Sequence, residues 1–248
     1  MSRRKAGSAR IVITSIIFLT IAALALVGIW YFGQNGTKPQ NARSGAPEQL
    51  AGVGPDGTDG DPILNRLKNR ATAPATVKDY NVDQIIAIPN DILEQEGRRQ
   101  RSNWYPAARL HAQQYESLGA RVTGYIVKAK QSGLESANGY VDSLRDYHIW
   151  ISETPEGSRA RSLIVEMTPR WKAIHPEWRL RYLQSLVENR AKVRVTGWLL
   201  WDEEHASEVD KSRGTQWEIH PVTLFEVWSN GRWEDLKGND AAEDIELP

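Results

Sequence analysis

The chain has 248 residues, of which 25% are charged and none is cysteine. The ordinary charged fraction excludes a wholly disordered protein, and the absence of cysteine excludes disulfides, thiolate metal sites and cysteine nucleophiles. The formal net charge is zero, but the six basic residues before position 48 have no acidic counterpart there, which leaves 25 basic against 31 acidic residues in the remainder. This acidic remainder disfavours nucleic acid as a partner without excluding it.

The N-terminal region predicts a transmembrane anchor. Residues 11–32 carry no charge and are mostly Ile, Leu, Val and Ala, and a helix of that length, at about 1.5 Å per residue, spans a hydrocarbon core of roughly 30 Å. The basic residues within 1–10 hold that end in the cytoplasm, so the rest of this single-pass cell-membrane protein is expected outside it. A cleaved signal peptide is the alternative, but it would have a shorter apolar run and a small-residue cleavage site.

The next two segments are expected to lead up to the folded body. Residues 33–77 are rich in Gly, Pro, Asn, Asp and Ala, which is typical of a flexible linker, with a short helical turn near 62–67. Residues 78–117 are interpreted as a lead-in segment that is partly helical. At the other end of the chain, residues 237–248 are interpreted as an acidic disordered tail.

The folded body is predicted over residues 118–236. One helix is expected over 177–189, because Trp178, Tyr182 and Leu186 recur there at helical spacing. Glycines interrupt the first and fourth strands, as the sharp bends of a small closed barrel require. β-rich runs predict five strands, over residues 120–127, 147–152, 162–168, 192–201 and 215–227.

This order, β-β-β-α-β-β, gives a mainly β body with one long helix, and it resembles the OB-fold, a five-stranded Greek-key barrel. The resemblance covers about residues 118–230 and implies ligand binding on the outer face of the second and third strands. Staphylococcal-type nucleases share the fold, but their arginine and carboxylate set does not align with this sequence. The segments 146–148, 165–169 and 217–221 also resemble functionally uncharacterised bacterial membrane-anchored proteins, which implies no activity.

Side chains alternate between an apolar and a polar row along the second and third predicted strands. The apolar row of the second strand, expected inside the barrel, consists of Tyr147, Ile149 and Ile151. The outward row is expected to bind the ligand through Asp146, His148, Trp150, Glu166 and Thr168.

The turn between these two strands predicts their register. A turn centred on Gly157 pairs His148 with Glu166, and the same register pairs Trp150 with Ile164. His148 and Glu166 are therefore the candidate catalytic residues, and a cross-strand ion pair is the alternative interpretation of the two. A slip of one residue would separate them onto opposite faces.

A second acidic and histidine-containing cluster occurs on the fifth strand. Glu218 and His220 alternate there on one face, and residues 202–205 add Asp, Glu and His after the fourth strand. Because these residue types bind divalent metals, His148, Glu166, Glu218 and His220 are candidate ligands. The alternative is that Glu218 and His220 bond to the backbone at a strand bend beside Pro221. No recognised ligand spacing occurs, so no cofactor is expected beyond a divalent metal.

These observations favour a membrane-tethered, extracytoplasmic OB-like binding module that recognises an unidentified ligand or envelope protein. A divalent-metal-dependent hydrolase is the second hypothesis, and a structural interaction domain of an envelope complex is the third. Convergence of the five acidic and histidine residues would favour the hydrolase, and their separation would exclude it. Those five residues are Asp146, His148, Glu166, Glu218 and His220.

Overall fold

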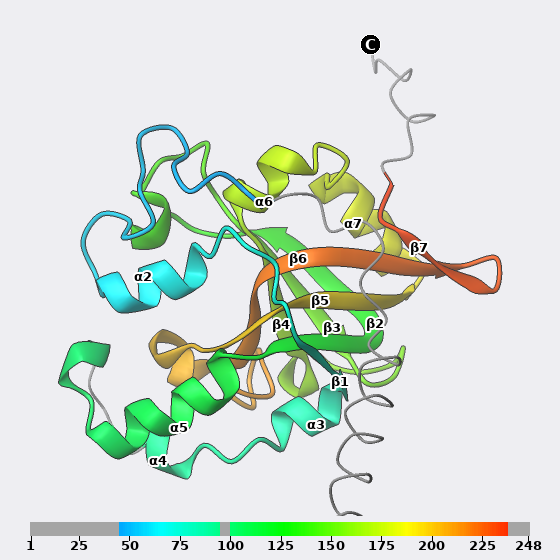
Figure 1. Cartoon of the computed structure of the whole chain (residues 1–248). Coiled ribbons are helices and arrows are strands. Elements are labelled where there is room, and N and C mark those ends of the chain that lie inside the picture. The colour runs from blue at the N-terminus through cyan, green and yellow to red at the C-terminus, as the bar shows by residue number, and fades with distance from the viewer. Residues whose placement is uncertain (1–44, 95–99, 238–248) are drawn as a thin grey trace, which may run out of the picture. The chain divides into compact units, whose positions relative to one another are not determined.

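The structure of the protein is a computed structural model, which describes residues 45–94 and 100–237 (Figure 1). The predicted cytoplasmic segment 1–10, the anchor 11–32 and nearly all of the tail 237–248 lie outside the described residues. Within the described residues, no helix combines the length and the apolar character needed to cross a bilayer.

Five strands form a closed barrel of mixed direction, consistent with the OB-like fold predicted from the element order. They pair in the order β2-β3-β4-β6-β5, and β5 pairs back onto β2. The β4–β6 pairing is parallel and the other pairings in the barrel are antiparallel. The barrel strands are β2 (Gly119–Gln131), β3 (Tyr147–Ser152), β4 (Leu163–Met167), β5 (Lys192–Trp201) and β6 (Trp217–Ser229).

Further elements surround the barrel. The strand β1 (Val77–Asn81) pairs in parallel with β2, and β7 (Arg232–Asp235) forms a hairpin with β6. The α-helices are α2 (Pro62–Lys68), α3 (Val82–Ile86), α4 (Asp91–Glu94), α5 (Pro106–Glu116), α6 (Pro169–Ile174) and α7 (Leu180–Glu188). Short 3-10 helices are η1 (Arg101–Asn103), η2 (Ser136–Asn138), η3 (Arg159–Arg161) and η4 (Glu203–Glu208).

The connection between β4 and β5 differs from the single long helix that was predicted. It contains α6 and α7, because His175 leaves helical geometry at the end of α6 and the backbone re-enters a helix only after Arg179. The predicted helix over 177–189 therefore corresponds to α7, which begins three residues later.

The predicted register between the second and third barrel strands is confirmed: His148 lies opposite Glu166, and Trp150 lies opposite Ile164. Ile149 and Ile151 are fully buried in the barrel core, as the apolar row predicts. Gly124 on β2 is required by close packing, since a Cβ there would lie 2.5 Å from the Ile151 Cγ2 atom.

Residues 45–77 differ from the flexible linker predicted for 33–77. They hold α2 and lie against the barrel domain (Figure 1). The fully buried Arg170 guanidinium of α6 donates hydrogen bonds to the carbonyl oxygens of Val53 and Gly54, both at 2.9 Å, and to Asn69 Oδ1 at 2.7 Å. The contacts that order this segment come from a residue more than a hundred positions away. The local composition, which is typical of a flexible linker, contains no sign of them.

Candidate functional site

The outward face of β3 and β4 is buried beneath a second layer of the same domain. Trp150 is only 2% exposed, and its indole Nε1 donates a hydrogen bond to the Ser212 carbonyl oxygen at 2.5 Å. Asp146 and Thr168 are also buried, at 1% and 2% exposure. Strand alternation correctly predicts that these side chains point away from the barrel core, but the open recognition surface expected there is absent from the described face.

Under this layer, Asp146, Glu166 and His220 converge. One ligand atom from each of the three lies within 4.8 Å of the corresponding atoms of the other two. Asp146 precedes β3, Glu166 lies on β4 and His220 lies on β6, so the β3–β4 and β4–β6 pairings bring them together. All three are buried, and we call them the inner triad.

A carboxylate holds the imidazole of the inner triad in a fixed orientation. His220 Nδ1 lies 3.0 Å from Glu218 Oε1, and the other oxygen of Glu218 accepts a 2.6 Å hydrogen bond from Arg213 Nη2. With Nδ1 engaged in this way, His220 Nε2 faces Asp146 Oδ2 at 3.7 Å. A carboxylate that orients a histidine so that its second nitrogen is free is the usual outer arrangement of a protein metal site.

Glu166 also belongs to a second group of possible ligands, with Glu135 and His148, which we call the outer triad. His148 Nε2 lies 3.1 Å from Glu166 Oε1 and 3.4 Å from Glu135 Oε1. Glu135 and His148 are half-buried, whereas Glu166 is buried. The outer triad therefore extends the cluster from the interior toward solvent.

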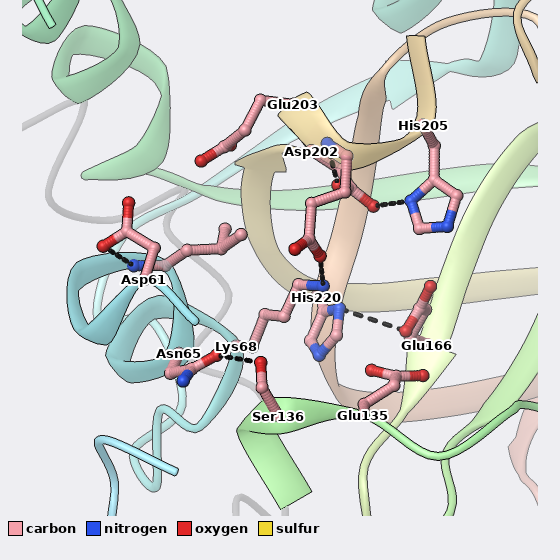
Figure 2. A network of polar contacts seen from close by, with 12 residues as sticks. Asp61, Asn65, Lys68, Glu135, Ser136, Glu166, Asp202, Glu203, His205 and His220 are labelled. Atoms are coloured by element: carbon pink, nitrogen blue, oxygen red, sulfur yellow. Dashed lines mark hydrogen bonds and ion pairs between the residues drawn. The ribbon is translucent and has the colours of Figure 1, made fainter. Parts of the chain in front are cut away.

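Figure 2 shows how residues from distant segments surround this cluster. Glu166 and His220 face each other, 3.2 Å apart between Oε2 and Nδ1. The Lys68 side chain extends from α2 toward the cluster, and Glu135 lies on the opposite side of it. Asp202 lies beside His205, with 2.5 Å between Asp202 Oδ2 and His205 Nδ1.

Several buried polar atoms of the two triads make no well-aligned hydrogen bond in the described structure, although they lie within ion-pair distance of one another. They include Asp146 Oδ2, Glu166 Oε2 and His220 Nε2 of the inner triad, and Glu135 Oε2 and His148 Nε2 of the outer triad. Leaving such a group unsatisfied costs roughly 1–3 kcal/mol, so buried polar groups are normally paired. A cation held between these atoms would satisfy them together.

Burial and close charges shift the titration of the cluster. Burial raises the pKa of Asp146 to about 8, and the nearby carboxylate of Glu135 adds to that rise. Burial alone would lower the pKa of His220, but Glu166 and Glu218 raise it to about 9. The pKa of Glu166 is lowered because two imidazoles, those of His148 and His220, outweigh its burial. Protonated imidazoles can therefore neutralise the negative charge of the carboxylates. This ion-pair arrangement is the alternative to a bound metal ion.

The structure assigns Glu218 a different place from the one predicted. Glu218 belongs to neither triad and instead joins His220 to Arg213. In the described structure the Glu218 carboxylate contacts these two side chains, whereas the strand-bend alternative expects hydrogen bonds to the backbone. His148 and Glu166 do touch, as predicted.

Sequence patterns did not reveal Lys68, Glu135 and Arg213 as parts of the cluster. Lys68 lies in the segment predicted as a linker, and the other two lie between strands, where side-chain alternation gives no signal. The pKa of Lys68 is raised well above its ordinary value, because Asp202 and other carboxylates outweigh its burial. Only the folded arrangement connects these residues to the triads.

Comparison with known proteins found no matching family model, no matching curated protein and no matching solved structure. The class of this chain is therefore defined by its own structure: a closed five-stranded mixed barrel, consistent with an OB-like fold, that buries an acidic and histidine-containing cluster.

Proposed function

We propose that this domain is a binding module for a divalent cation, held by Asp146, Glu166 and His220. The observation that carries the proposal is the inner triad itself, in which each residue keeps a buried ligand atom that makes no hydrogen bond and lies within 4.8 Å of the other two residues' ligand atoms. The hydrogen bond from His220 Nδ1 to Glu218 supports it, because it leaves Nε2 available as a ligand. Nitrogen and carboxylate oxygen donors suit zinc or manganese better than soft-ligand metals.

Metal titration of the purified full chain in a neutral detergent tests this proposal. A cation that binds the folded state stabilises it, by about 2.7 kcal/mol at a concentration 100 times its Kd, which corresponds to a rise in Tm of roughly 5–10 °C for a domain of this size. We expect this rise with zinc or manganese after prior chelation, with one bound ion per inner triad. Absence of both binding and a thermal shift with zinc, manganese and calcium would contradict the proposal.

A divalent-metal-dependent hydrolase is the second candidate, favoured by the half-buried position of Glu135 and His148 at the edge of the cluster. A metal-bound water there could be activated as a nucleophile, with a carboxylate of the outer triad as its proton acceptor. Turnover of ester and phosphoester test substrates by the metal-loaded chain, lost after chelation, would support it. Stoichiometric metal without turnover would leave the binding module as the function.

We also propose, from the composition of residues 11–32, that the domain is tethered to the membrane and lies outside the cytoplasm. An envelope protein, or a structural role in an envelope complex, is the partner class that this location suggests. Protease added to intact cells, compared with protease added to lysed cells, tests the location. Digestion of the domain only after lysis would contradict it.

A further inference from the structure

Three cationic side chains surround the indole ring of Trp150. The Arg159 Cζ atom lies 4.9 Å from the ring centroid, Lys128 Nζ lies at 5.4 Å and Lys130 Nζ lies at 5.7 Å. The two lysines alternate on β2, where Lys128 is paired with Trp150, and Arg159 comes from η3 in the β3–β4 connection. We call these three residues the cationic cluster.

Within the described residues, none of these three side chains makes a salt bridge or a hydrogen bond with a carboxylate, and all three contact the Trp150 ring instead. The Nε atom of Arg159 is buried and has no hydrogen-bond partner. Burial lowers the pKa of Lys128, and the charges of Arg159 and Lys130 lower it further. The repulsion between like charges held close together in this way decreases when an anion binds between them.

The position of the cationic cluster connects it with the acidic and histidine-containing cluster. Lys130 lies directly opposite His148 in the β2–β3 pairing, and the His148 ring is 6.3 Å from the Trp150 ring. An anion held by the three cations would therefore lie beside the outer triad, at its half-buried edge.

We infer that Lys128, Lys130 and Arg159 form a subsite that binds the phosphate group of a ligand. A multiply charged anion matches three cations, and the planar guanidinium of Arg159 matches two phosphate oxygens. The phosphate can belong to a soluble phosphate compound or to a lipid headgroup. The subsite deepens the proposed function by naming the chemistry of what would lie next to the metal, but phosphate binding itself does not require the metal.

Isothermal titration of the metal-free full chain in a neutral detergent, with the chelator removed, tests the subsite with two probes. The soluble probe is inorganic pyrophosphate, and the lipid probe is dihexanoyl phosphatidylglycerol, compared with the zwitterionic dihexanoyl phosphatidylcholine. We expect at least one of the two phosphate probes to bind, with an affinity that falls as salt rises. Pyrophosphate binding would identify a soluble source, and binding of phosphatidylglycerol alone would identify a lipid headgroup.

The triple variant K128Q/K130Q/R159Q is expected to weaken this binding at least roughly 10-fold. Loss of even one hydrogen bond between a charged side chain and the anion is enough to lower the affinity by about that factor. The matched control is K192Q/K237Q/R232Q, which removes three exposed cations elsewhere and should leave the affinity unchanged. If the first triple variant does not fold, Lys130→Gln alone, at an exposed position, should still weaken binding.

The use of the metal-free chain separates this inference from the proposed metal site, because phosphate binding is then measured with no ion at either triad. Failure of the metal proposal would therefore not remove the phosphate signal. The inference is overturned if neither phosphate probe binds, or if the triple variant binds as tightly as the unmodified chain.

Discussion

Replacing Arg213 with methionine is expected to destabilise the domain by roughly 3–5 kcal/mol, because removing one partner of a buried ion pair leaves the other charge uncompensated. Arg213 is 2% exposed, and its guanidinium bonds Glu218 at 2.6 Å and lies 3.5 Å from Asp202. Both carboxylates would remain buried after the substitution. Thermal unfolding followed by circular dichroism should show a Tm lower by roughly 6–20 °C.

The control for this prediction is Arg232→Met, which breaks an ion pair of the same kind on the surface. Arg232 donates to Glu234 at 2.7 Å, but its side chain is 76% exposed. Exposed pairs contribute little, so this variant should unfold at the temperature of the unmodified chain. Equal Tm values for the Arg213 and Arg232 variants would show that the buried network does not stabilise the fold as described.

Replacing Glu166 with glutamine is expected to weaken divalent metal binding at least about 100-fold, since loss even of an outer partner of a metal ligand costs 10–100-fold. Glu166 is the residue that the two triads share, so its substitution alone removes a carboxylate ligand from both of them. Glutamine keeps the shape of the side chain, which limits the change to charge and donor chemistry. Competition titration against a chromophoric chelator measures the two affinities.

Glu226→Gln is the matched control for this second prediction. Glu226 lies on β6, is 7% exposed and pairs with Arg194 away from both triads. Its substitution removes a buried carboxylate of the same barrel and should leave metal affinity unchanged. If Glu166→Gln and Glu226→Gln bind metal equally well, the inner triad is not the metal site.

Local patterns carried the prediction of the barrel. Strand alternation placed Ile149 and Ile151 inside, and the turn around Gly157 placed His148 opposite Glu166; the structure confirms both. These features are set by contacts between neighbouring strands, so a short stretch of sequence contains the information. The β4–β6 pairing, which brings His220 to the same place, follows from closure of the barrel.

The second layer could not be predicted in the same way. Trp150 points away from the barrel core as its position predicts, yet it is buried by a segment that has no periodic pattern. Lys68 and Arg170 show the same limit, because their contacts join segments far apart in the chain. Alternation predicts the direction of a side chain, whereas its exposure depends on what the rest of the chain places above it.

X-ray absorption spectroscopy of the zinc-loaded full chain, compared with its His220→Gln variant, tests the metal site most directly. We expect one zinc ion with nitrogen and oxygen donors, and loss of the imidazole contribution in the variant. Unaltered imidazole scattering in the variant, or no retained zinc in the unmodified chain, would contradict a metal site formed by His220, Asp146 and Glu166.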